Sequence, residues 1–142
     1  MREDFCARQV RPGAVFRLFV CNTNPPKIKI LVVIATCNDG QYALAGCLYI
    51  NSEINTNCLN TPELQALQLP LACADYGFLA HDSYLDCSHI FKMSTQEIER
   101  IFCDDGDVYL GEIPPVTLDA AKAKVAGAKS IPAKLRNQFG LL

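Results

Sequence analysis

One run of β-branched and aliphatic residues constrains this chain most. Residues 31–36 read Leu-Val-Val-Ile-Ala-Thr, and they follow residues 27–30, where lysine and isoleucine alternate. A continuous apolar run of this length is typical of a strand that is buried on both faces. Its β-branched content disfavours a helix. We therefore predict that residues 31–36 form the central strand of a sheet.

The neighbouring segments supply partners for this strand. Arg11-Pro12-Gly13 predicts a turn that leads into a strand over residues 14–20. Asn38-Asp39-Gly40 predicts a tight turn, because glycine reaches positive φ at little cost, and residues 42–50 then return as the antiparallel partner. The first third of the chain is thus predicted to be a three-stranded meander.

The middle of the chain reads as a long loop followed by short strands. Residues 51–70 are polar and predict a loop with a short helical turn at residues 62–67. Two short strands are predicted at residues 76–79 and 83–87.

The last third changes to helical spacing. Ser94 and Glu97 have the spacing of a capping box, which predicts a helix through Phe102. Residues 108–113 predict a short strand or an extended link, Thr117 is expected to cap a second helix through residue 128, and residues 130–132 open a last short helix.

These elements predict one domain over residues 1–142, mainly β with appended helices. The chain has 142 residues, of which 50% are hydrophobic and 20% charged, which suffices for one core. Five or six strands followed by helices favour a small antiparallel barrel with C-terminal helices.

Charge is unevenly distributed although the net charge is only −2. Residues 1–29 and 121–142 are basic, whereas residues 30–120 are acidic and contain only Lys92 and Arg100 as cations. If the two basic ends met each other or the Lys27–Lys29 stretch, they would form a positive face suited to nucleic acid. Solvated termini are the alternative explanation.

The eight cysteines are scattered without a Cys-x-x-Cys pair, which favours reduced thiols over a disulfide framework. Cys87, His89 and His81 form the one candidate metal cluster, but they lack the fourth ligand of a structural zinc site. We therefore predict no metal and no cofactor. The longest apolar stretch is far shorter than a membrane span, and the N-terminus has no apolar signal core, so we expect a cytoplasmic protein.

The order of the motifs resembles the PemK/MazF family of toxins from toxin-antitoxin systems. Five segments spread over most of the chain carry the resemblance: residues 11–16, 27–34, 48–52, 82–88 and the Gly-Glu-Ile of residues 111–113 with the helix after it. The resemblance implies an SH3-like barrel that is usually a homodimer. It also implies a metal-independent endoribonuclease that cuts single-stranded RNA and is inhibited by an antitoxin-like protein.

Cleavage of RNA without a metal needs a group that takes the 2′-hydroxyl proton, a cation for the phosphorane and a donor for the leaving oxygen. Such toxins use an arginine at the start of the second strand and a serine or threonine after the third. Here Ser52 follows the third strand, but Lys27 and Lys29 stand where the arginine is expected. Lysine supplies a point charge instead of a bidentate fork. The resemblance thus makes Lys27, Lys29 and Ser52 the candidate catalytic residues.

Four more residues in the resembling segments are candidates for substrate binding: Arg11, Asn51, Asp82 and Tyr84. Each also has a structural interpretation, since Asn51, Ser52 and Asp82 suit turns and Tyr84 suits a half-buried strand. The two lysines equally suit the solvent face of a strand end. Two functions therefore stay open: the endoribonuclease, and an inactive barrel that binds nucleic acid or protein.

Overall fold

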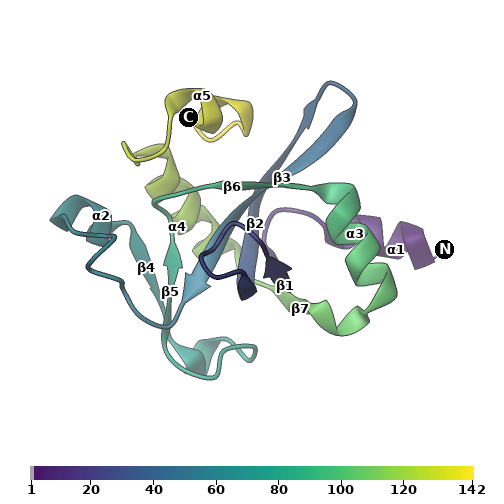
Figure 1. Cartoon of the computed structure of the whole chain (residues 1–142), viewed down its shortest axis with the longest axis horizontal. Helices are drawn as coiled ribbons and strands as arrows, with labels where there is room; N and C mark the ends of the chain where they lie inside the picture. Colours follow the sequence, from purple (N-terminus) through teal and green to yellow (C-terminus); the bar gives the residue numbers. More distant parts are fainter. Residues whose placement is uncertain (1) are drawn as a thin grey trace.

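The strand predicted to be central is central in the computed structural model of the chain, which describes residues 2–142 and side chains from Asp4 onward (Figure 1). This strand, β2 (Lys27–Asp39), pairs with β1 (Ala14–Val20) on one side and β3 (Tyr42–Asn51) on the other. Leu31, Val32, Val33 and Ile34 have no solvent-exposed surface. The predicted meander is confirmed.

Four shorter strands extend the antiparallel sheet: β4 (Gln68–Leu71), β5 (Ser83–Asp86), β6 (Phe91–Ser94) and β7 (Tyr109–Glu112). The strand order is β4-β5-β3-β2-β1-β7, and β6 pairs with β3. Within residues 2–142 the pairing runs from β4 to β7 without joining the two ends. The mainly β architecture is confirmed, with a sheet that is open in its strand pairing.

Helices cover both faces of this sheet (Figure 1). On one face, α1 (Arg2–Gln9) and α3 (Thr95–Asp104) pack beside each other. On the other face lie α4 (Pro115–Ala126) and α5 (Ala133–Gln138). The remaining short elements are α2 (Pro62–Ala66) and the 3₁₀ turns η1 (Cys73–Asp75) and η2 (Gly106–Val108).

Two apolar layers result, one on each face of β2. Val32 and Ile34 point into the layer under α4 and α5, whereas Leu31 and Val33 point into the layer under α1 and α3. The register with β3 shifts between Val33 and Ala35, as at a β-bulge, so that Ala35 joins the same layer as Ile34. Burial on both faces explains why residues 31–35 of β2 are uniformly apolar.

The helix predicted from Ser94 is confirmed, because Ser94 Oγ accepts a hydrogen bond from the Glu97 backbone N–H at 3.4 Å. The prediction that Thr117 caps the next helix is wrong. That helix begins at Pro115, since proline is favoured in the first helical turn, where its missing N–H costs nothing. Thr117 is buried instead, and its Oγ1 lies 2.7 Å from the Tyr76 hydroxyl.

A second correction concerns residues 76–79, which form a turn and not a strand; the Leu79 N–H donates to the Tyr76 carbonyl at 3.0 Å. Their apolar side chains pack against the core from a loop, which produces a strand-like pattern without strand pairing. One helix and two strands were not predicted: α1, β4 and β6.

The two basic ends of the chain do not meet. The N-terminal helix and the C-terminal helices lie on opposite faces of the sheet (Figure 1). Two C-terminal cations bond to backbone carbonyls: Lys124 to Ala66 and Arg136 to Ala126. The Arg2 side chain lies outside the described residues. Of the helices described, none has the length and apolar character needed to cross a membrane.

Candidate functional site

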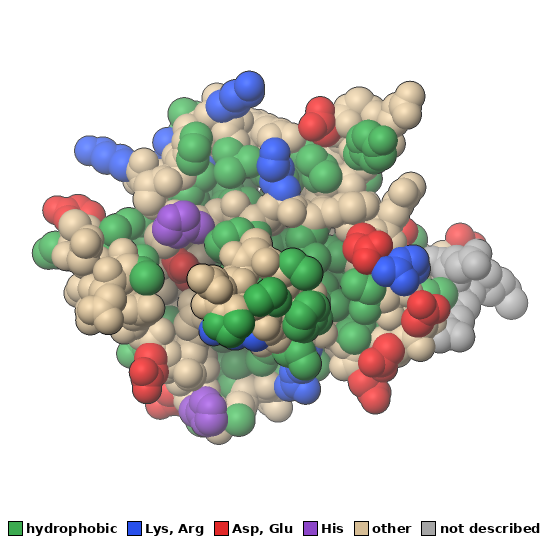
Figure 2. Space-filling view, in the orientation of Figure 1, with side chains coloured by type: hydrophobic (Ala, Val, Ile, Leu, Met, Phe, Trp, Pro, Cys, Tyr) green, Lys and Arg blue, Asp and Glu red, His purple; other side chains and the backbone are tan. Residues whose placement is uncertain are grey.

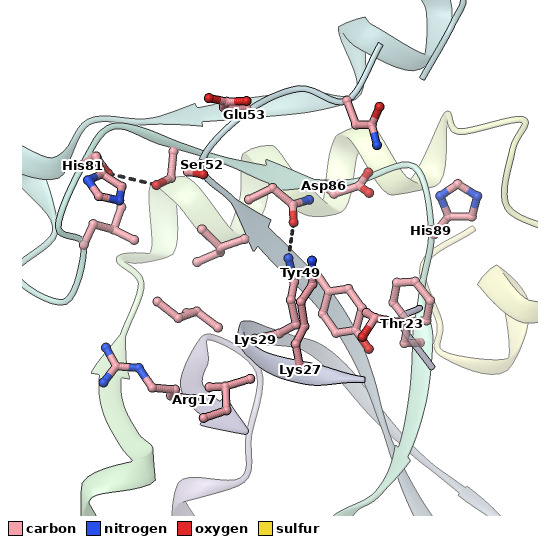
Figure 3. Close-up of a pocket in the computed structure, with 18 of the residues that line it drawn as sticks. Arg17, Thr23, Lys27, Lys29, Tyr49, Ser52, Glu53, His81, Asp86 and His89 are labelled. Carbon is pink, nitrogen blue, oxygen red and sulfur yellow. Dashed lines mark hydrogen bonds between the residues drawn. The ribbon is translucent and has the colours of Figure 1, made fainter. Parts of the chain in front are cut away.

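A cleft of about 680 Å³ opens where β2 begins and β3 ends (Figure 3). The polar ends of these strands form one wall, the β1–β2 loop and the loop before β5 contribute further side chains, and the β5–β6 link closes one side. Four predicted site residues line the cleft: Lys27, Lys29, Asn51 and Ser52.

Lys27 and Lys29 lie alongside each other because alternate residues of a strand share a face (Figure 3). Lys29 donates a hydrogen bond to Asn51 Oδ1, and its Nζ lies 5.5 Å from the centre of the Tyr49 ring. Burial and the charge of Lys27 lower the pKa of the Lys29 ammonium below its ordinary 10.5, while Asp86 opposes that shift. Two cations are therefore held together with incomplete neutralisation, which favours an anionic ligand.

Aromatic rings form the floor beside these cations. The rings of Tyr49 and Phe91 are stacked, with centroids 4.3 Å apart and planes 14° apart. Tyr49 donates its hydroxyl hydrogen to Asn22 Oδ1. Burial raises the pKa of the Tyr49 hydroxyl, so the group stays a neutral donor. Aromatic side chains next to cations are the combination that binds single-stranded nucleic acid.

A polar chain runs from β5 to the rim of the cleft. Asp86 Oδ1 accepts hydrogen bonds from Gln68 Nε2 at 2.8 Å and from the Ser88 N–H at 2.9 Å, as well as from the Ser88 hydroxyl. Ser88 Oγ lies 2.8 Å from Nδ1 of His89. Ser88 is fully buried, whereas His89 is exposed and lines the cleft.

The sheet itself positions this chain. β5 pairs with β3 as far as Leu85 opposite Ile50, and β6 resumes pairing with Phe91 opposite Cys47. Residues 86–90 must therefore span a gap that β3 crosses with only two residues, Leu48 and Tyr49. The extra residues form a loop in which Ser88 points into the core and His89 points towards solvent.

Ser52 lies away from the lysines. Figure 3 shows it on the same side of the cleft as His81, while Lys27, Lys29, Asp86 and His89 lie towards the other side. Strand alternation explains the difference, because Asn51 shares the face of Lys29 and the next residue points away. Arg17 of β1 adds a further cation to the lining.

Three predicted substrate-binding residues lie outside the cleft lining. Arg11 forms an exposed ion pair with Glu112, with Nη2 2.5 Å from Oε1, which joins the entrance of β1 to β7. Asp82 Oδ1 accepts from the Cys73 N–H at 2.9 Å. Tyr84 is half-buried on β5, opposite Asn51 on one side and Pro70 on the other.

The candidate metal cluster is not assembled. Figure 2 shows the two histidines of the chain well apart on this face, with basic and apolar side chains between them. Cys87 is buried, and burial raises the pKa of its thiol to about 12. No group of three His, Cys, Asp or Glu side chains within the described part of the chain could hold a metal ion.

Sequence reasoning missed Tyr49, Phe91, Asp86 and His89 as parts of this site. Tyr49 could have been found, because it stands two residues before Asn51 and therefore on the same face of the strand. The others depend on how β5 and β6 pair with β3, for which the sequence carries no local signal.

Comparison with models of known protein families gave no match for this chain. A search of curated proteins gave no significant match either.

Proposed function

We propose that this protein is a metal-independent endoribonuclease that cuts single-stranded RNA in the β2–β3 cleft, as do the PemK/MazF toxins that its sequence resembles. One observation carries the proposal: Lys27 and Lys29 are held side by side at the cleft, with Lys29 fixed between the Tyr49 ring and Asn51. Lysine pairs of this kind hold a phosphodiester and stabilise the charge that develops on it.

The rest of the lining suits the same substrate. Phe91, half-buried at the cleft, offers an apolar ring to an unstacked base, and Asn22 and Asn51 offer amides for base edges. Ser52, on the far side of the cleft, helps to position the RNA strand and does not act on the reacting phosphate. No step of this chemistry requires a metal or cofactor.

The resemblance adds finer proposals on fold, partners and location. We propose that the strongly bent sheet, whose register shifts between Val33 and Ala35, is an SH3-like barrel. We also propose a cytoplasmic homodimer that an antitoxin-like protein inhibits. Light scattering on the purified protein tests the dimer, and a monomer at micromolar concentration would refute it.

The test of the function is cleavage of single-stranded RNA in the presence of a chelator. We expect the wild-type protein to cut, and Lys27→Ala or Lys29→Ala to slow cutting about a hundredfold, because losing one transition-state donor costs about 3 kcal/mol. Lys134→Ala is the matched control, since Lys134 is exposed on α5 over the opposite face. Ser52→Ala should have a smaller effect. Undiminished cutting by both lysine variants would eliminate this site.

An inactive binding module is the second candidate. It is favoured by the lysines themselves, which lack the planar fork that orients a phosphate bidentately. If the wild-type protein binds RNA through Lys27 and Lys29 but leaves it intact, the protein is such a module.

A further inference from the structure

We propose that His89 is the general base of this site, held in its active tautomer by Ser88 and Asp86, an inference that rests on the ribonuclease function proposed above. The proposal follows from counting hydrogen-bond donors along the chain Asp86–Ser88–His89. It does not come from the motif resemblance, which places no role on His89.

The Asp86 carboxylate accepts hydrogen bonds and donates none. The contact between Asp86 Oδ1 and Ser88 Oγ is therefore made by the serine hydrogen. A serine hydroxyl has a single hydrogen, so the 2.8 Å contact between Ser88 Oγ and His89 Nδ1 needs its hydrogen from the imidazole. Neutral His89 is thus protonated at Nδ1, and its Nε2 is an unprotonated acceptor.

Burial makes this assignment rigid. Ser88 has no exposed surface, so water does not compete for its hydroxyl. Gln68, itself 5% exposed, fixes Asp86 from β4, and Ser130 Oγ donates to the Ser88 carbonyl at 2.6 Å. Partners that hold one ring nitrogen determine what the other can do. The imidazole ring is exposed at the rim, 6.4 Å from the Phe91 ring and 27° from parallel to it.

The chemical step then balances on groups at the cleft. His89 Nε2 takes the proton of the ribose 2′-hydroxyl, the 2′-oxygen forms a bond to phosphorus, and the bond from phosphorus to the 5′-oxygen breaks. The leaving 5′-oxygen takes a proton from water, and the hydroxide that results takes the proton that His89 holds, which gives a 2′,3′-cyclic phosphate and a 5′-hydroxyl and returns His89 to its neutral form. Lys27 and Lys29 offset the charge on the phosphate. His89 is the catalytic residue, and Ser88 and Asp86 are positioning residues.

The kinetic test uses His89→Ala, which removes an exposed side chain and should leave the fold intact. We expect cleavage to fall at least a hundredfold, within the range that a general base contributes. Binding of a 2′-O-methyl RNA, which cannot be cut, should change less than about twofold. Added imidazole should restore part of the activity.

A second measurement reads the tautomer without any cleavage. The chain has two histidines, so His81→Ala leaves one set of imidazole signals in a long-range ¹H–¹⁵N spectrum. We expect neutral His89 to show the hydrogen on Nδ1. Ser88→Ala and Asp86→Ala should each shift the population towards hydrogen on Nε2. Ser94→Ala removes a hydroxyl that caps α3 and belongs to no contact of the Asp86–Ser88–His89 chain, so it is the control and should leave the tautomer unchanged.

The outcomes separate this inference from the function on which it rests. Wild-type protein that cuts RNA while His89→Ala cuts equally well would overturn the role of His89 and leave the ribonuclease standing. A hydrogen on His89 Nε2 in the wild-type spectrum would overturn the proposed chain of hydrogen bonds from Asp86 through Ser88 to His89. Wild-type protein that cuts no RNA would refute the function and with it the base, whatever the tautomer.

Discussion

Three cations line the cleft, Arg17, Lys27 and Lys29, and their number sets how steeply RNA binding must depend on salt. A phosphate contact on a single strand releases counterions, and each contact contributes about 0.7 to the slope of log affinity against log salt. Three contacts give a slope of about −2, so affinity should fall about 20-fold when salt rises from about 50 to about 200 mM.

Replacing Lys29 by alanine removes one contact. The slope should become about −1.4, and the same rise in salt should then lower affinity only about sevenfold. Fluorescence anisotropy with a labelled 2′-O-methyl RNA measures both slopes on an uncut ligand. Lys134→Ala, in which an exposed lysine outside the cleft lining is lost, should keep the wild-type slope.

Two results would refute this reasoning. A wild-type slope near zero would mean that phosphates are not bound by cations in the cleft. Equal changes of slope in Lys29→Ala and Lys134→Ala would mean that binding follows overall charge and not the pair on β2.

Three further predictions follow from other contacts. RNA affinity should decrease as the pH is raised, and the decrease should begin below pH 10.5. Burial lowers the pKa of Lys29, and its charge disappears as the pH rises through that lower value. Binding titrations across pH measure this. Ser94→Ala should lower the free energy of unfolding in urea by about 1 kcal/mol, because the cap of α3 is lost. Burial raises the pKa of the Cys47 and Cys87 thiols to about 12, so both should resist a thiol reagent at pH 8 that labels the exposed Cys21 at once.

The centre of the fold could be predicted because burial on both faces leaves a clear trace in sequence. Residues 31–35 are apolar throughout and buried, and they lie in the central strand, where such a run must lie. The register shift between Val33 and Ala35 could not be predicted from this run. A bulge changes which face of the sheet a residue joins, and both faces are apolar here, so the sequence pattern is the same with or without it. Such register shifts decide whether a sheet closes into a barrel or stays open, and composition does not encode them.

The site was predictable only on its β2 and β3 side. Alternation placed Lys27 and Lys29 on one face, and the structure confirms this arrangement. The same rule separates Ser52 from them, since it is adjacent in sequence to Asn51 and points the other way. His89 reaches the cleft through the loop between β5 and β6, and the length of that loop matters only once both strands pair with β3.

Tyr49 connects the two halves of the proposed site. Lys29 lies over its ring, Phe91 stacks on it at 4.3 Å, and the His89 ring follows at 6.4 Å from Phe91. These four side chains come from β2, β3, β6 and the link before β6. Aromatic side chains have few rotatable bonds, and Tyr49 is only 6% exposed, so Tyr49 is a fixed contact between Lys29, the proposed phosphate-binding cation, and Phe91, beside which the proposed base His89 lies. The geometry we propose for cleavage is therefore set by strand pairing, and a change at Tyr49 would disturb phosphate binding and proton transfer together.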